Sequence, residues 1–296
     1  MISFQDRSGA AQAALLPSWQ HLVGAPNSLR QQAETGCVPD GSDPGHADSW
    51  GIGWFDDAGQ VSLIRQTGSA AASGYFVIAA ESASRGGAGN GPARSLIGHL
   101  RKASMGAVTG ENAHPVRADF APSDGRPGDS LLVAHNGTVR APLLKSLRED
   151  LERAGKIAAA RSDNDTVVLA AWLAGRVESS DDPFLRLADS LRVLTERSRL
   201  LADSDFAGDE TRCYTALNLV MAHPDGLFVL RQFRREPEYY TLYARPLTEA
   251  GPDGGFLIAS ERTDENALWE LLTPGELMHF PARPNEAIRV ARIADT

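Results

Sequence analysis

The hydrophobic pattern of this chain changes period twice, and this change limits the folds open to it. Apolar stretches of strand length come first, at residues 49–55, 95–101 and 130–135. Apolar residues then recur at helical spacing up to about residue 202, and strand-like stretches return after residue 214. Strands and helices do not alternate regularly. The order therefore predicts antiparallel sheets covered by helices rather than a doubly wound parallel sheet.

Three consecutive helices are predicted in the middle of the chain. The first carries a stripe of leucines that includes Leu143, Leu147 and Leu151, and the others cover residues 163–177 and 183–202. Such helices suit the outer layer of a sheet. Since no internal repeat or linker interrupts the pattern, we expect residues 1–296 to form a single domain.

Composition and charge exclude several classes of function. The chain has 296 residues, of which 42% are hydrophobic, so it can bury a sizeable core. Its net charge of −9 argues against nucleic acid and anionic membrane surfaces as partners. Neither a signal peptide nor an apolar run near the roughly 18 residues of a membrane span is present, which predicts a cytoplasmic protein. The two cysteines give no disulfide framework and no zinc spacing, so we expect neither cofactor nor metal.

Polar groups gather in four short segments, where a buried core would not need them. Two of these segments end predicted strands, one lies in a loop and one begins a predicted helix. In chain order they are residues 98–104 (GHLRKAS), 111–115 (ENAHP), 134–138 (AHNGT) and 162–165 (SDND).

Each segment also has a structural interpretation. Asn136 followed by Gly137 is a strong hairpin signal. Ser162 or Asp163 would serve as a helix N-cap. Arg101 would be an ordinary cation at the end of a strand. The histidines of these segments, whose spacing fits no common zinc pattern, would be structural: His99, His114 and His135.

Taken together and in this order, the segments resemble the class II glutamine amidotransferases. That family carries G-H-x-R-x-A-[TS], then N-x-H-P, then H-N-G, then S-D-x-[ED]. The closer resemblance is to its stand-alone branch, the γ-glutamyl amide hydrolases and their relatives. Three further stretches resemble that branch, so that the likeness runs from Pro26 to Glu261: residues 26–32 (PNSLRQQ), 46–54 (HADSWGIGW) and 258–261 (IASE).

The resemblance implies an α+β fold, the four-layer α/β/β/α sandwich of N-terminal-nucleophile hydrolases. It implies that Arg101 binds the substrate α-carboxylate, a task that suits a bidentate guanidinium. Asp163 would hold the α-ammonium group. Asn136 and Gly137 would form the oxyanion hole, through a side-chain amide and a backbone N–H. Three further residues match positions that would support this site: His99, Ser104 and His114.

The chain departs from the family at its first residues. In the family the mature chain begins with a cysteine, whose thiolate attacks the amide while its own α-amine acts as the base. Here position 2 is Ile2, and Ser3 would point to the opposite face of a strand. Cys37 falls in a loop before the first aromatic strand, and Cys213 is distant from all four segments. We interpret both cysteines as structural or incidental.

Two hypotheses about function follow. The chain would bind glutamine or a γ-glutamyl compound but be catalytically impaired, and act as a binding or regulatory subunit for a synthase or another regulatory protein. Alternatively, it would be an active glutamine amidotransferase or γ-glutamyl amide hydrolase with an unrecognised nucleophile. Release of ammonia from glutamine distinguishes the two.

Overall fold

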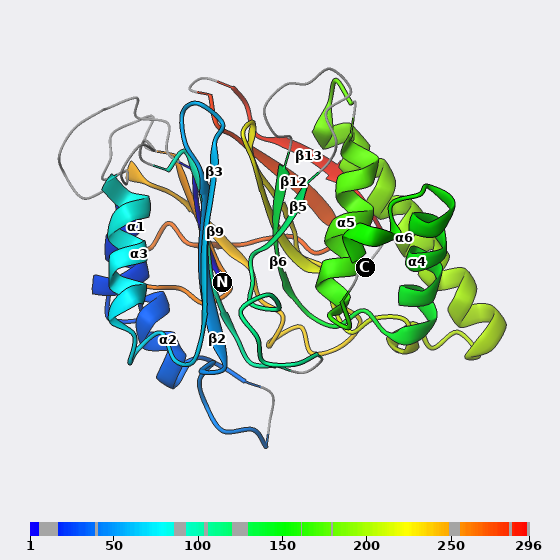
Figure 1. The fold of residues 1–296 in the computed structure, drawn as a ribbon, viewed down its shortest axis with the longest axis horizontal. Coiled ribbons are helices and arrows are strands. Elements are labelled where there is room, and N and C mark those ends of the chain that lie inside the picture. Colours follow the sequence, from blue (N-terminus) through cyan, green and yellow to red (C-terminus); the bar gives the residue numbers. More distant parts are fainter. Residues whose placement is uncertain are drawn as a thin grey trace.

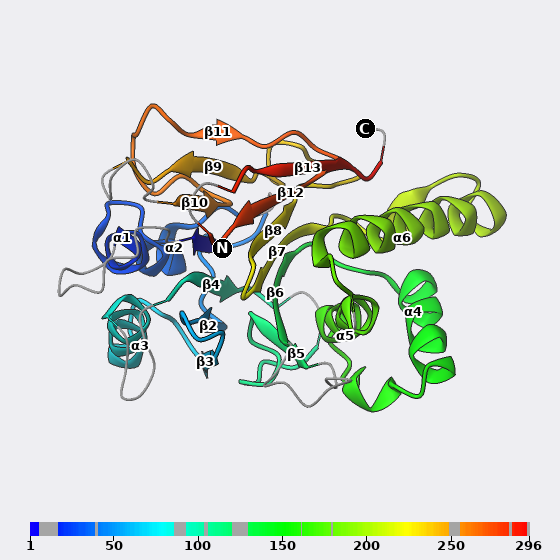
Figure 2. The same ribbon diagram turned by 90° about the horizontal axis from the view of Figure 1, so that it is seen from above.

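Two antiparallel sheets stacked face to face form the centre of the molecule, as a computed structural model shows (Figure 1). Helices cover the outer face of each sheet (Figure 2). The structure describes residues 1–5, 17–38, 41–85, 93–103, 106–119, 130–160, 162–178, 180–248, 255–283 and 286–294.

The described chain begins with a mixture of strands and helices, has the helices α4 to α6 in its middle and ends in strands. The helices are α1 (Pro17–Trp19), α2 (Leu29–Thr35), α3 (Gly74–Arg85), α4 (Ala141–Arg153), α5 (Asp165–Val177) and α6 (Pro183–Asp205), with a π-helical turn at Gln20–Gly24 and 3-10 turns at Ile157–Ala160 and Glu210–Arg212. The strands are β1 (Ile2–Gln5), β2 (Ser49–Phe55), β3 (Val61–Thr67), β4 (Ser95–Arg101), β5 (Val116–Asp119), β6 (Ser130–Asn136), β7 (Asn218–His223), β8 (Gly226–Leu230), β9 (Tyr243–Pro246), β10 (Phe256–Ala259), β11 (Glu270–Leu271), β12 (Glu276–Pro281) and β13 (Arg289–Arg292).

The first sheet has the strand order β11-β9-β10-β1-β4-β2-β3, and the second has the order β13-β12-β8-β7-β6-β5. Strand β1 lies inside the first sheet, where Ile2 pairs with Gly98 of β4 on one side and with Ala259 of β10 on the other. The expectation that residues 95–101 and 130–135 form inner strands is confirmed, since β4 and β6 each pair with a strand on both sides.

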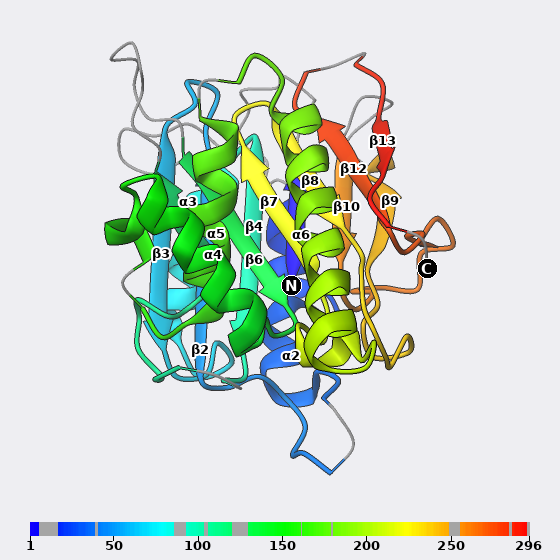
Figure 3. The same ribbon diagram turned by 90° about the vertical axis from the view of Figure 1, so that its right-hand side faces the viewer.

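Three apolar layers separate the four layers of secondary structure. The first lies between α1–α3 and the first sheet and includes Trp50 and Phe76, whose rings meet edge to face. The second fills the space between the sheets and includes Phe55 and Leu132. The third lies between the second sheet and α4–α6, which face the viewer in Figure 3, and contains Trp172. The predicted four-layer α+β sandwich is therefore confirmed.

Strand β2 shows how the sequence sets the spacing of these layers. Trp50, Ile52 and Trp54 all belong to the apolar layer on the helical side of the sheet. The intervening Gly51 and Gly53 face the second sheet, and a Cβ atom on Gly51 would lie 2.4 Å from the backbone oxygen of His114. The glycines therefore allow the close approach of residues 113–115, which positions the cavity described below.

Several boundaries differ from those predicted. Helix α5 begins at Asp165 rather than at 163, and its N-cap is Asn164, whose Oδ1 accepts from the backbone N–H of Thr166 at 2.8 Å. Neither Ser162 nor Asp163 caps the helix. In the part of the chain after residue 214, where strand-like stretches are predicted, residues 237–240 instead form a turn that precedes β9, and Glu236 O accepts from the backbone N–H groups of Tyr239 and Tyr240.

Candidate functional site

A cavity of about 410 Å³ lies where β4 and β6 end, between the two sheets. Its walls come from segments far apart in the sequence: the first residue, the loop before β2, the start of α5, the turn before β9 and the end of β10. The described residues that line it are Met1, Gln32, Cys37, Ser42, His46, His99, Leu100, Arg101, Lys102, Ala103, His114, His135, Asn136, Gly137, Thr138, Asn164, Asp165, Thr166, Glu238, Tyr239, Tyr240, Thr241, Ser260 and Glu261.

Arg101 is the buried cation of this cavity and the last residue of β4. Its Nη1 donates to the backbone oxygen of Ala107 at 3.3 Å. Burial lowers the pKa of Arg101, while the nearby carboxylates of Asp165 and Asp48 oppose that effect. A guanidinium starts so far above neutral pH that Arg101 stays charged. It therefore presents a fixed positive charge beside a buried acid.

Asp165 is that buried acid, at the first turn of α5. Its Oδ2 accepts from the backbone N–H of Val139 at 2.6 Å, which ties the helix start to the segment after β6. The loop before β5 is joined to the same helix start through Asn112. That side chain donates to the backbone oxygen of Ala107 at 3.0 Å and accepts from Ser162 Oγ at 3.1 Å. The segments 101–114 and 162–165 therefore meet through direct hydrogen bonds.

Residues 135–138 form another part of the cavity wall, and hydrogen bonds to residues 215 and 216 hold them in place. Nε2 of His135 lies 3.0 Å from the backbone oxygen of Ala216, which can only accept, so this nitrogen carries the proton. Nδ1 is then free to accept from Thr166 Oγ1 at 3.1 Å. Gly137 adopts φ 145°, and a Cβ atom there would lie 2.2 Å from the oxygen of Ala216. Only glycine fits at this point without distortion.

We expect Gly137→Ala to distort the cavity and to destabilise the fold by about 2 kcal/mol, because a side chain would require both an unfavourable φ and a displacement of Ala216. Urea denaturation measures the change. Gly155→Ala is the matched control, since Gly155 also has a positive φ but an added Cβ would meet nothing within 4 Å. Equal losses in the two variants would mean that strain alone, and not the contact with Ala216, sets the cost.

His99 and His114 form the buried floor of the cavity. Their rings lie 4.6 Å apart between centroids, and Nδ1 of His99 is buried with no hydrogen-bond partner among the described residues. Burial, followed by the neighbouring His114, lowers the pKa of His99 well below its usual value. Burial also lowers the pKa of His114, to about 3. Both rings are therefore neutral at physiological pH and can exchange hydrogen bonds with an uncharged polar group.

The loop before β2 bends back into the cavity and brings Cys37 with it. Gly45 N–H bonds to Gly36 O at 3.0 Å, and His46 Nε2 lies 3.0 Å from Cys37 O. The backbone N–H of Cys37 donates to Glu261 Oε1 at 3.0 Å. Among the described residues of the lining, only Cys37 carries a thiol. These hydrogen bonds fold the loop inward and place Cys37, which the sequence analysis left in a loop outside the four segments, in the wall of the cavity.

Cys213 lies in the apolar layer on the far side of the second sheet, where its Sγ contacts the oxygen of Ser198 at 3.4 Å.

Met1, directly before β1, lines the cavity, and its amino nitrogen donates to Ser260 Oγ at 3.0 Å. Ile2 turns to the helical side of the first sheet. Met1 is therefore the residue that the first strand presents to the cavity.

Most of the predicted site residues line this cavity. Arg101, Asn136 and Gly137 do so together with His99 and His114. Ser104 lies outside the described residues.

Asp163 does not line the cavity with the other predicted site residues. It is exposed and is not one of the lining residues, because α5 starts two residues later and turns Asn164 and Asp165 inward instead. The predicted convergence is therefore incomplete at this position.

Sequence reasoning missed several lining residues. Asp165 occupies the last position of the S-D-x-[ED] segment, and Glu261 ends the 258–261 stretch, so both lay within recognised motifs. The sequence around Glu238 and Tyr239 does not indicate that they line a cavity, because its pattern is equally typical of a turn on the surface.

In the parts of the chain that the structure describes, no group of three or more His, Cys, Asp or Glu side chains could hold a metal ion. Likewise, no described helix is both long and apolar enough to cross a bilayer.

Four layers of secondary structure, with a polar cavity beside the start of β1, define a fold of the N-terminal-nucleophile hydrolase type. The profile of the family described as "Glutamine amidotransferases class-II" matches residues 34–204, more than half of the chain. The chain belongs to this family. A search of curated protein sequences found no match.

Solved structures share the fold. The first is a glutamine phosphoribosylpyrophosphate amidotransferase from B. subtilis, with 16% identity and a TM-score of 0.57 over 100% of this chain and 49% of that chain. The second, an allosteric regulatory enzyme of purine biosynthesis, has 16% identity and a TM-score of 0.58 over the same shares. This chain thus spans about half the length of those two enzymes. A glutamine aminotransferase class-II domain protein from Silicibacter pomeroyi matches 84% of this chain and 97% of that chain, with 17% identity and a TM-score of 0.52.

Proposed function

We propose that this protein binds glutamine or a γ-glutamyl compound in the cavity, has lost most of the amide-cleaving chemistry, and acts as a binding or regulatory subunit. We further propose that residues 1–296 form one amidotransferase-type domain that works with a partner synthase or regulatory protein.

The observation that carries this proposal is the pairing of Arg101 with a buried carboxylate in one cavity. A glutamyl head carries an α-carboxylate and an α-ammonium group, which would compensate Arg101 and Asp165 respectively. Asn136 and the N–H of Gly137 lie in the same lining and would receive the side-chain carbonyl. A site that had lost its ligand would have little reason to keep charges buried, because apolar replacements are often neutral or stabilising.

The proposed loss of chemistry rests on the two sulfur-containing side chains of the described lining, Met1 and Cys37. Met1 offers a thioether, which has no proton to lose and does not act as the nucleophile of an amide hydrolysis. Burial raises the pKa of the Cys37 thiol, and the neighbouring Glu261 raises it further. A thiol with a raised pKa is protonated at neutral pH, and the thiolate is the nucleophilic form.

We expect release of ammonia from glutamine to stay below about 1 s⁻¹, the low end of ordinary enzymes. Without an activated nucleophile, positioning and an oxyanion hole leave only a residual of about 10³–10⁴ over water. A coupled assay for ammonia at saturating glutamine measures it. Turnover well above that limit would contradict the impairment and leave the binding proposal intact.

The second candidate is an active amidohydrolase that uses Cys37, and the placement of this thiol in the cavity favours it. We expect Cys37→Ala and Cys37→Ser to leave both ligand affinity and the residual ammonia release unchanged, because burial and then the neighbouring Glu261 raise the pKa of the thiol and keep it protonated. Loss of turnover in both variants, with the melting temperature preserved, would instead identify Cys37 as the nucleophile.

A further inference from the structure

The turn before β9 forms one wall of the cavity and contains a buried tyrosine, Tyr240. This residue lines the cavity and is only 7% exposed. Its hydroxyl donates to Oγ1 of Thr215 at 3.1 Å. Burial raises the pKa of Tyr240, so the hydroxyl keeps its proton at neutral pH and remains a donor. The turn is therefore joined to Thr215 by a side-chain hydrogen bond inside the protein.

Thr215 lies beside the segment that would receive the carbonyl group of the ligand. Its Oγ1 also accepts from the backbone N–H of Thr138 at 3.0 Å, and its own backbone N–H donates to Thr138 O at 3.0 Å. The N–H of Thr138 belongs to the peptide group between Gly137 and Thr138. One threonine therefore holds the peptide groups on both sides of Thr138.

Gly137 depends on such restraints, because its N–H is the proposed oxyanion donor. A glycine has no side chain to limit its backbone, and Gly137 has a φ of 145°. On one side, Asn136 pairs with Asn218 of β7. On the other side, Thr215 holds Thr138. The direction of the Gly137 N–H is therefore set from both sides, and one of the two supports is Thr215.

The turn that carries Tyr240 is itself fixed by Arg231, the residue after β8. Arg231 is 4% exposed. Its Nε donates to Tyr240 O at 2.9 Å, its Nη2 to Pro237 O at 3.0 Å and its Nη1 to Leu272 O at 3.1 Å. The planar guanidinium presents these donors in a rigid fork. The backbone of Tyr240 is therefore fixed, and its ring reaches Thr215 from a set position.

The turn meets the segment 214–218 at a second point. Asn218 Nδ2 donates to Thr241 O at 3.3 Å, and its Oδ1 accepts from the backbone N–H of Gln232 at 3.1 Å. This contact holds the turn in place without the Tyr240 hydroxyl. The bond from Tyr240 is the contact that reaches Thr215 Oγ1 and, through it, Thr138. Loss of the hydroxyl should therefore leave the turn docked and loosen Thr138.

We propose that Tyr240 is a positioning residue: through Thr215 it holds the peptide group between Gly137 and Thr138, so that the Gly137 N–H points at the γ-carbonyl of the ligand. This proposal deepens the proposed function and rests on it, since it assumes that this segment receives the carbonyl. It connects a turn beside the first sheet to the carbonyl-binding segment of the second sheet.

Amide hydrogen exchange in the ligand-free protein tests the positioning directly. Tyr240→Phe removes the hydroxyl and keeps the ring. We expect the N–H of Thr138 to exchange about fivefold faster, the factor that corresponds to loss of one ordinary hydrogen bond, because Thr215 Oγ1 can then turn away. Thr215→Ser retains the hydroxyl and should exchange at the wild-type rate. Tyr243→Phe is the control, since Tyr243 packs against Trp269 and is not in the lining.

Calorimetric titration with glutamine and norvaline tests the consequence for binding. Norvaline has the same α-amino-acid head and the same number of carbons as glutamine, but it lacks the γ-carbonyl. We expect Tyr240→Phe to lower the glutamine-to-norvaline affinity ratio at least about threefold, since a hydrogen bond that is misaligned but not lost is worth less than the full fivefold. A purely structural role would weaken both ligands equally and leave the ratio unchanged.

A double variant tests whether both residues act through one hydroxyl. Tyr240→Phe/Thr215→Val should give the same affinity ratio as Thr215→Val alone, because the single change already removes the oxygen that Tyr240 holds. Additive losses in the double variant would show that Tyr240 acts on the ligand by another route and would overturn the proposal.

The remaining failures are distinguishable. Exchange of Thr138 at the wild-type rate in Tyr240→Phe would overturn the positioning role, whatever the ligands do. An unchanged affinity ratio would overturn it as well and leave the proposed function standing. If neither ligand binds to the wild-type protein at tens of millimolar, the proposed function fails, and with it the role of Tyr240 in binding.

Discussion

Replacing Arg101 by alanine is expected to abolish measurable binding of glutamine and γ-glutamyl compounds. A buried guanidinium forms two parallel charge-assisted bonds with a carboxylate. Truncation of one partner of such a pair costs at least about 2 kcal/mol, a factor of about thirty in affinity. The loss should exceed that value, because Asp165 would then lack its cationic neighbour and repel the ligand carboxylate. Isothermal titration calorimetry measures it.

Two further variants separate charge from geometry. Arg101→Lys keeps the charge but loses the planar fork, so we expect it to restore only part of the affinity. Arg199→Ala removes an exposed arginine of α6 that pairs with Glu196 and should leave binding unchanged. Wild-type affinity in Arg101→Ala, with a folded protein by thermal melt, would show that the cavity does not hold an α-amino-acid head.

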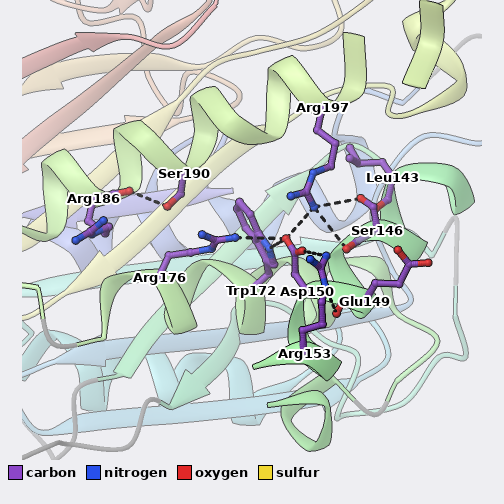
Figure 4. Close-up of polar contacts among 10 residues, drawn as sticks. All are labelled: Leu143, Ser146, Glu149, Asp150, Arg153, Trp172, Arg176, Arg186, Ser190 and Arg197. Atoms are coloured by element: carbon purple, nitrogen blue, oxygen red, sulfur yellow. Dashed lines mark hydrogen bonds and ion pairs between the residues drawn. The ribbon is translucent and has the colours of Figure 1, made fainter. Parts of the chain in front are cut away.

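The largest expected effect on stability lies at Asp150, on the outer helical layer (Figure 4). This carboxylate of α4 accepts from Trp172 Nε1 at 2.9 Å, from Arg176 at 3.3 Å and from Arg197 at 2.8 Å. It also pairs with Arg153 of its own helix. Asp150 thus joins α4, α5 and α6 through a single side chain that is 12% exposed.

We expect Asp150→Ala to destabilise the fold by about 3 kcal/mol, because it leaves the buried indole N–H unpaired and the arginines without their common counter-charge. Asp150→Asn should cost less, since its oxygen can still accept from Trp172. Urea denaturation measures both. Glu196→Ala, which breaks an exposed pair on α6, should not shift the midpoint measurably. Equal midpoints for all three variants would show that the cluster contributes nothing.

The interactions of Asp150 also predict how the stability of the fold depends on pH. Burial raises the pKa of Asp150, but hydrogen bonds from Trp172 and Arg197 outweigh it, so the pKa in the folded state is below its usual value. Its stabilising contribution is therefore complete above the unfolded pKa of about 3.9 and is lost as pH falls through the folded value. The difference in stability between wild type and Asp150→Asn should hold from pH 5 to 7 and shrink only below about pH 4.

The apolar pattern of short stretches was sufficient to predict the strands at the centre of the fold. The bounds predicted for β2 and β4 agree with the structure, because both strands are continuous apolar runs bounded by polar residues and buried along their whole length. Helix α3 was not recognised. Its buried side is formed mostly by small residues such as Ala79, Ala80 and Ala83, which give a weak apolar stripe.

The site was harder to predict than the fold, because long-range backbone bonds decide which loops reach it. Arg101 and Asn136 could be recognised because they end β4 and β6 within ordered motifs, and Gly137 follows Asn136 directly. Nothing in the composition of the loop around Cys37 predicts that His46 N–H bonds to Ala33 O, or that Asp48 N–H bonds to Arg101 O, two of the contacts that fold this loop inward. The start of α5 was displaced by two residues, which was enough to exchange Asp163 for Asp165 in the cavity wall.

The position of β1 between β4 and β10 has a consequence for the order in which the protein is made. Residues 2–5 leave the ribosome long before residues 256–259, their partners in β10. At roughly 5–20 residues per second, about 13 to 50 s pass between the two events. Throughout that interval one edge of β1 has no partner, and such an edge can pair with another chain. Chaperone contact with the nascent chain would matter most during this period, and the wall formed by Ser260 and Glu261 is completed only at its end.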